Sequence, residues 1–310
     1  MRVFIRLTLL TMALMVAAAR PSAAAALRVV ATTEDLASLA REVGGDKVTV
    51  IAMAKGYQDP HFVDPKPSFI LEMSRADVLI VVGRELEIGW LSPLMTSSRN
   101  AKVQPGANGY LDASSNVKIL EIPTGQLTRA MGDVHPQGNP HYWLDPANGR
   151  RIAQTIMNKL GELSPPDRAY FEQRYAVFDK KLAAAESRWD ATMAPYKGTK
   201  IVTYHRSWPN FMERFGLNVI GYVEPKPGIP PTTSHTIELI DEMKKQGAKV
   251  IVVEPYFDLK TPQAIATKVS GEVLVLAPSV GGSKEAADYI GLFDYDVNAV
   301  VAALKRTTGK

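Results

Sequence analysis

Short apolar runs alternate with amphipathic segments along most of the chain. Residues 77–82 and 249–253 are almost wholly apolar, which is typical of parallel strands that are buried on both faces. The segments between such runs carry apolar residues at helical spacing, and many of them end at glycine or proline, which stop helices. Strands that alternate with helices predict an α/β protein, with helices packed on parallel sheets.

This pattern gives specific expectations for the secondary structure. The expected strands occupy residues 27–31, 47–53, 77–82, 117–122, 199–204, 218–223, 249–253 and 272–276. The expected helices between them occupy residues 33–43, 67–75, 146–163, 208–215, 234–246, 262–269 and 294–304.

The longest predicted helix divides the chain into two halves. It begins at Ser164 and is ended by Pro195. Its apolar face carries Tyr170, Phe171, Tyr175, Phe178, Leu182 and Trp189. About 30 residues span roughly 45 Å, enough to run the height of two domains. We therefore predict two α/β lobes, each with a mostly parallel sheet flanked by helices, at residues 27–163 and 197–310, joined by a rigid connecting helix at residues 164–196.

The first 26 residues have the parts of a secretory signal peptide. Arg2 and Arg6 give a positive start, residues 7–18 are apolar, and residues 22–26 are small. The apolar run is shorter than the roughly 20 residues that a membrane span needs. We expect a signal peptide at residues 1–26, removed on export; the alternative is an uncleaved membrane anchor.

Cysteine content and charge narrow the class further. The chain has no cysteine, so it forms no disulfide and offers no residue for a bacterial lipid anchor, and we expect a free secreted protein. Three arginines in the predicted signal peptide supply most of the formal net charge of +4. The other basic residues are spread along the chain, without the basic patch or stripe of a nucleic-acid-binding protein.

Three of the five histidines lie where a predicted strand gives way to a loop. They are His61 in Asp59-Pro60-His61, His141 in Pro140-His141-Tyr142-Trp143-Leu144-Asp145-Pro146, and His205 in Tyr204-His205. Local zinc motifs have closely spaced ligands, whereas widely spaced histidines can converge where several strands end in one cleft. Neutral imidazole suits zinc, copper, nickel and iron, while manganese prefers carboxylates and water. The pattern predicts a metal site between two domains, with zinc favoured.

Neighbouring residues add candidates for supporting roles. One or more of Asp59, Asp64 and Asp145 could orient an imidazole by accepting a hydrogen bond from its second nitrogen. His135 lies in a polar loop at residues 123–140, and we expect it to be mobile and at most a weak collector of metal. His235 opens a helix, where capping or solvent exposure is expected. The alternative is that all these histidines are unrelated residues of polar loops.

Together these motifs make the chain resemble the substrate-binding proteins of metal-specific ABC transporters, which deliver zinc or manganese to a membrane importer. The resemblance covers essentially the whole chain after residue 26. It implies two lobes with the metal between them, His61 and His141 from the first lobe and His205 from the second. It also implies a periplasmic protein with a membrane permease as partner and no enzymatic activity. We further expect a monomer, and a periplasmic metallochaperone is another candidate partner.

Two features depart from the family's pattern. Many members supply a fourth ligand, an aspartate just after the last strand, but residues 276–280 contain no carboxylate. The fourth position is open to water or to another carboxylate, for which Glu254 is our candidate; the alternative is that Glu254 is a structural acid. The histidine-rich loop of many zinc-specific members is reduced here to His135.

Other functions fit some of these features. Catalytic zinc is also held by three protein ligands and a water, so a secreted zinc-dependent hydrolase with Glu254 as general base is one alternative. The sequence contains no His-Glu-x-x-His motif to support it. A manganese-binding member of the same transport family is a second alternative. A surface adhesin is a third, against which the missing lipid-anchor cysteine argues.

Overall fold

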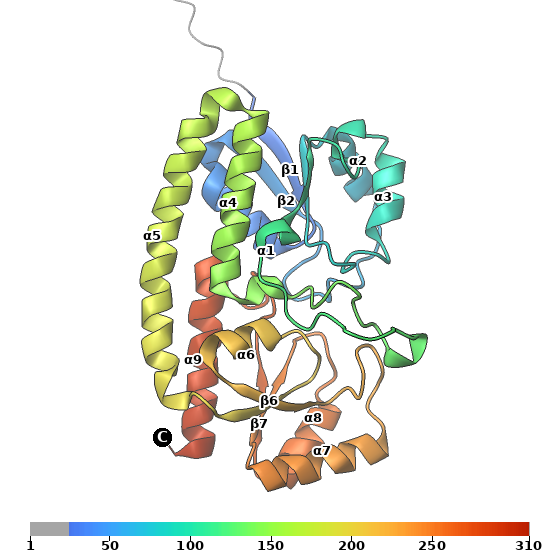
Figure 1. Ribbon diagram of the computed structural model, residues 1–310, viewed down its shortest axis with the longest axis vertical. Coiled ribbons are helices and arrows are strands. Elements are labelled where there is room, and N and C mark those ends of the chain that lie inside the picture. The colour runs from blue at the N-terminus through green and yellow to red at the C-terminus, as the bar shows by residue number, and fades with distance from the viewer. Residues whose placement is uncertain (1–24, 310) are drawn as a thin grey trace, which may run out of the picture.

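Two parallel four-stranded sheets form the centres of two lobes, one above the other in Figure 1. The computed structural model describes residues 25–309, so the predicted signal peptide lies outside the described residues except for its last two. The first sheet has the order β2-β1-β3-β4 and the second β6-β5-β7-β8. This arrangement confirms the predicted α/β class with two lobes.

The first lobe contains strands β1 (Leu27–Ala31), β2 (Val48–Ala52), β3 (Val78–Val81) and β4 (Tyr110–Asp112), and helices α1 (Glu34–Gly44), α2 (Pro67–Arg75), α3 (Leu91–Ser98) and α4 (Pro146–Leu163). The second lobe contains β5 (Lys200–Thr203), β6 (Asn218–Tyr222), β7 (Val250–Val253) and β8 (Glu272–Val275), with α6 (Pro209–Phe215), α7 (Thr233–Gln246), α8 (Lys260–Lys268) and α9 (Tyr289–Thr308). The strands β3 and β7 are buried along their whole length, as expected for strands covered on both faces.

The strand expected at residues 117–122 is wrong. This segment forms no strand, and the short strand β4 completes the first sheet instead. The backbone N–H of Lys118 donates to Asn148 of α4 at 2.8 Å, and the carbonyl of Leu120 accepts from Asn139 at 2.8 Å. Because these partners satisfy the backbone, the segment packs beside α4 rather than at a sheet edge. Helix α3 was not expected from the sequence pattern.

Helix α5 (Arg168–Met193) runs beside both lobes. Its 26 residues span about 39 Å, and it packs against α1 and α4 of the first lobe and α9 of the second (Figure 1). The largest group of buried apolar side chains is continuous through these four helices and both sheets. A large apolar interface of this kind opposes relative motion of domains, so the lobes are held at a fixed separation.

Buried hydrogen bonds add to this contact between lobes. Asp35 of α1 accepts from the hydroxyl of Ser279 and, at 3.0 Å, from the N–H of Val280, both in the loop after β8. The indole of Trp143 donates to the carbonyl of Pro278 in the same loop, at 2.9 Å. Asp35 is wholly buried, and this burial raises its pKa to about 7.

Asp35 therefore makes the stability of the fold depend on pH. Because its pKa is higher in the folded chain, its contribution is fully present below the unfolded pKa of about 4 and is lost as the pH rises to about 7. Asp35→Asn keeps an acceptor for Val280 but does not ionise. We expect the fall in unfolding free energy between about pH 5 and about pH 7 to shrink by about 1 kcal/mol or more. Denaturant unfolding at a series of pH values measures it, and equal slopes in both proteins would contradict this role.

Candidate metal centre

His61 is fixed by the aspartate two residues before it. The loop after β2 turns at Asp59, whose Oδ1 accepts from the backbone N–H of His61 at 3.0 Å and lies 2.7 Å from its Nδ1. The indole of Trp90 donates to the carbonyl of Pro60 at 3.0 Å and so fixes the same loop. Burial acts to raise the pKa of Asp59, but the hydrogen bond and charge of His61 outweigh it and lower that pKa. Asp59 is thus an ionised carboxylate that accepts a hydrogen bond from Nδ1–H of His61. Nε2 of His61 then carries a free lone pair.

His205 is held in the same way on the second lobe. It follows β5, and its Nδ1 lies 2.7 Å from Oε2 of Glu224, which follows the neighbouring strand β6. Burial acts to lower the pKa of His205, whereas the hydrogen bond with Glu224 and the nearby charge of Glu254 raise it above its usual value. The carboxylate again takes Nδ1 and leaves Nε2 directed elsewhere.

His141 is the most buried of the three predicted ligands, with 2% of its surface exposed. It precedes a short 3-10 turn, Tyr142–Leu144, whose side chains are all buried. Among residues 25–309, its Nε2 is one of five buried side-chain nitrogen or oxygen atoms without a hydrogen-bond partner. Burial lowers the pKa of His141 well below its usual value, and the charges of the neighbouring histidines act in the same direction. A neutral, unpaired imidazole nitrogen in this position has the chemistry to coordinate a metal.

The structure brings these three histidines together from two lobes. One ligand nitrogen from each of His61, His141 and His205 lies within 4.8 Å of the other two. The ring centroids are 5.1 to 5.7 Å apart. His61 and His205 lie just beyond the carboxyl ends of parallel strands, where ligands bind in open α/β sheets.

Glu254 lies close to the three histidines, but its carboxylate oxygens are not among the ligand atoms that lie within 4.8 Å of one another. It follows β7 and is wholly buried. Its Oε1 accepts from the indole of Trp208 at 3.1 Å, and its Oε2 has no hydrogen-bond partner among the described residues. Burial raises its pKa to about 7. Its proximity to His205 is compatible with either of the roles predicted for it.

We expected His135 to be mobile and at most a weak collector of metal. The loop at residues 123–140, here called the strap, places His135 beside the three histidines, with its Nε2 3.3 Å from Nε2 of His61. Burial and, to a smaller extent, the charge of His61 lower the pKa of His135 to about 4. His235, at the start of α7, instead donates from Nε2 to the carbonyl of Tyr222, 2.8 Å away.

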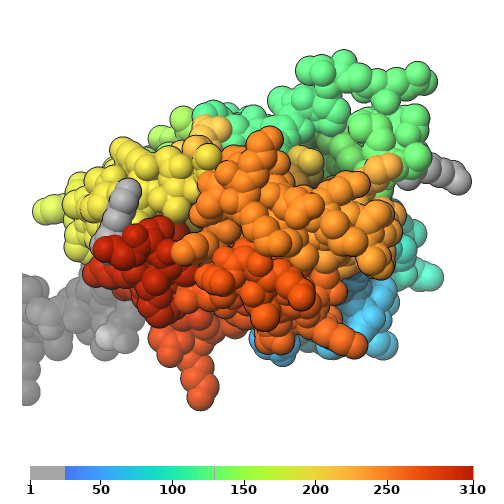
Figure 2. All heavy atoms as spheres, turned by 90° about the horizontal axis from the view of Figure 1, so that it is seen from below, coloured from blue at the N-terminus to red at the C-terminus, as the bar shows by residue number. Residues whose placement is uncertain are grey.

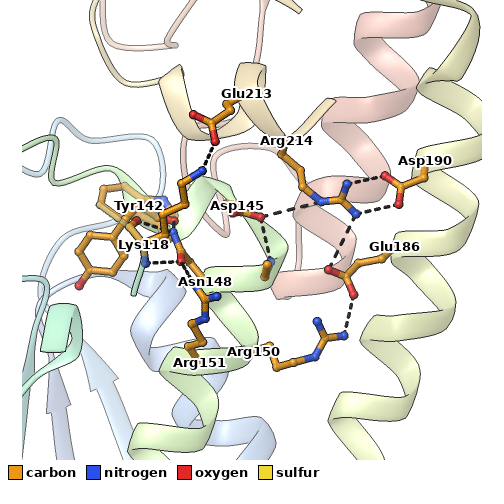
Figure 3. A network of polar contacts seen from close by, with 12 residues as sticks. Lys118, Tyr142, Asp145, Asn148, Arg150, Arg151, Glu186, Asp190, Glu213 and Arg214 are labelled. Atoms are coloured by element: carbon orange, nitrogen blue, oxygen red, sulfur yellow. Dashed lines mark hydrogen bonds and ion pairs between the residues drawn. The ribbon is translucent and has the colours of Figure 1, made fainter. Parts of the chain in front are cut away.

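The other two aspartates that were proposed to orient histidines, Asp64 and Asp145, have different surroundings. Asp64 is exposed. Asp145 caps α4 by accepting from the N–H of Ala147 at 2.9 Å, and it faces Arg214 of α6, 3.9 Å away (Figure 3). Arg214 also pairs with Asp190 of α5 at 2.7 Å. This network joins α4, α5 and α6 across the lobes and supports the site from outside.

Sequence reasoning missed Glu224 altogether. The sequence did contain a signal, because Glu224 lies just after the strand that follows His205 along the chain, and the ends of adjacent parallel strands lie together.

A cavity of about 330 Å³ opens beside the cluster between the strap and the second lobe. Its lining includes His135, His141 and His205 together with Arg206 and Lys226. This volume is large compared with a single metal ion, so the cavity has room for water molecules beside the histidines. Among residues 25–309, the helices are all too short or too polar to cross a bilayer.

Known proteins share this fold and are similar to this chain in sequence. A family model described as "Zinc-uptake complex component A periplasmic" matches residues 29–303. The manganese ABC transporter substrate-binding lipoprotein scaA of Streptococcus gordonii is 24% identical over 293 residues, which cover 92% of this chain and 91% of that protein. The high-affinity zinc uptake system protein ZnuA of Brucella abortus is 28% identical over 148 residues, 48% of this chain and 44% of that protein.

A crystal structure of ZnuA has a TM-score of 0.75 and 25% sequence identity to this chain, covering 90% of this chain and 99% of the other. The fold and the site thus define a substrate-binding protein of a metal ABC transporter. The chain belongs to the family of periplasmic zinc-uptake components.

The carboxylate beside His61 gives a direct test of the site. Asp59→Ala removes both contacts that orient the ring, and loss of such an outer partner costs roughly 10–100-fold in metal affinity. We expect that loss for zinc, measured by competition with a chelator. Asp64→Ala, in the same loop but exposed, is the matched control and should bind as the unchanged chain does. Equal affinities for the two variants would show that Asp59 does not support a metal ligand.

Proposed function

We propose that this protein captures a divalent transition metal, zinc in preference to manganese, and delivers it to an ABC importer. One observation carries the proposal: imidazoles from both lobes converge, two with Nδ1 held by carboxylates and one with a buried, unpaired Nε2. His61, His141 and His205 would coordinate the ion through nitrogen. Family membership supports a transport role rather than an enzymatic one.

The charge around the cluster suits a dication. Neutral histidines bring no charge of their own, while Asp59 and Glu224 place two carboxylates behind the rings. Two negative charges at this distance offset the cost of burying a doubly charged ion. Nitrogen ligands disfavour manganese, which prefers carboxylates and water, so the ligand set supports zinc over manganese.

The proposed setting follows from the sequence. The signal peptide expected at residues 1–26 would export the chain, and the absence of cysteine leaves it free in the periplasm. The partner that receives the metal would be the membrane permease of the importer. A monomer is proposed, and a periplasmic metallochaperone is a candidate donor of the metal.

Metal titration tests this function. The metal-stripped chain should bind one equivalent of zinc tightly and manganese much more weakly, in competition with a chelator. His205→Ala should weaken zinc binding by well over the roughly 10–100-fold expected for an outer partner, because it removes a ligand while leaving the core intact. Absence of a tight site for either metal would overturn the proposal. A tight site with unchanged affinity in the variant would remove His205 from it.

The carboxylate expected as fourth ligand needs its own experiment. Glu254→Gln keeps the acceptor for the indole of Trp208 but removes the negative charge. If Glu254 binds the metal, zinc affinity should fall by roughly tenfold or more, and thermal unfolding of the metal-free variant should stay close to that of the unchanged chain. Unaltered zinc affinity would assign Glu254 to a structural role.

A further inference from the structure

We propose that His135, carried by the strap at residues 123–140, is a fourth metal ligand and gives the site its preference for nitrogen-binding metals. The inference rests on the proposed function and concerns how the same site selects its ion. It departs from the expected carboxylate ligand and assigns the fourth position to an imidazole.

The distance between two ring nitrogens is the first argument. Zinc–nitrogen bonds of about 2.0–2.1 Å place two ligands of a tetrahedral site about 3.3–3.4 Å apart. Nε2 of His135 lies 3.3 Å from Nε2 of His61, so this pair already has the spacing of two ligands on one ion. Among the described residues, the group of ligand atoms within 4.8 Å of one another includes neither Glu254 nor His135, so the link of His135 to the site is its contact with His61.

The hydrogen-bonding state of His61 is the second argument. Its Nδ1 proton is held by Asp59 at 2.7 Å, so a neutral His61 presents a lone pair to His135. A direct hydrogen bond between the rings would require His135 to donate from Nε2. A metal ion between the two nitrogens satisfies both lone pairs at once.

The way in which the strap is anchored is the third argument. Its Asp133 donates from the backbone to Pro227 at 3.0 Å, and Lys226 donates to the carbonyl of Ala130, both contacts with the second lobe. On the first lobe, Arg84 donates to the carbonyl of Gln137 at 3.2 Å. His135 lies between these attachments, and the strap crosses between the lobes in Figure 1.

Close packing fixes the position of the strap. A Cβ on Gly132 would lie 2.3 Å from the carbonyl oxygen of Pro227, and one on Gly228 would lie 2.4 Å from the carboxylate of Asp133. Both glycines also have positive φ, which other residues rarely adopt. Figure 2, seen from below, shows the green strap standing beside the orange second lobe. The docking is therefore specific, and it delivers one imidazole to the mouth of the metal site.

The test compares His135→Ala with His235→Ala, which removes a histidine outside the cluster. Both variants of the full secreted chain are stripped of metal and titrated with Zn²⁺ and with Mn²⁺ against a chelator. We expect His135→Ala to lose at least the roughly 10–100-fold in zinc affinity that an outer partner is worth, and His235→Ala to lose none. His135→Asp should narrow the preference for zinc over manganese, because a carboxylate suits manganese better.

A spectroscopic measurement on the unchanged chain does not depend on any variant folding. With ¹⁵N-labelled histidine, zinc should shift the Nε2 signals of four of the five rings. Shifts of three rings, with equal zinc affinity in the two alanine variants, would overturn the role of His135 and leave the proposed function intact. Loss of affinity in Glu254→Gln but not in His135→Ala would assign the fourth position to Glu254. If the chain has no tight zinc site, the proposed function itself is wrong.

Discussion

The proposed metal centre depends on the two lobes being held at one fixed separation, because its proposed ligands come from both. His61 and His141 belong to the first lobe and His205 to the second, and their nitrogens must lie within a few ångströms of a common point. The continuous apolar core through α4, α5 and α9 supplies this constraint. Buried polar contacts, such as Asp35 with Val280, reinforce it between α1 and the loop after β8. Large hinge closure of the kind that engulfs a ligand would break these contacts.

Within this frame, carboxylates determine what the histidines can do. Asp59 and Glu224 each take the Nδ1 of a histidine, so Nε2 is the nitrogen that each ring has left for a metal. The same two groups balance the charge of a dication. Because the nitrogens are already oriented and the carboxylates offset the charge of the ion, a nearly rigid protein could bind the ion tightly without a large conformational change.

Much of the fold could be predicted from the sequence, because burial leaves a local pattern. The apolar run of β3 and the long amphipathic helix α5 are examples. The prediction of a strand at residues 117–122 failed because the backbone of this segment hydrogen-bonds to the side chain of Asn148 instead of to a neighbouring strand, a contact that no local pattern reveals. Helix α3 was missed altogether.

The site was only partly accessible from the sequence. The three histidines stood out because they lie at strand ends, where parallel sheets gather ligands. The position of His135 depends on how the strap docks against Pro227, and this docking depends on two glycines distant in sequence. Glu224 required knowledge that β5 and β6 are neighbours in the sheet.

The most direct test of the central claim is the position of the bound metal. Crystals of the secreted chain grown with one equivalent of zinc, with data collected at the zinc absorption edge, give that position without assumptions about ligands. The account predicts one strong anomalous peak about 2.0–2.1 Å from the Nε2 atoms of His61, His141 and His205. A peak elsewhere, or zinc bound without these three nitrogens, would contradict it.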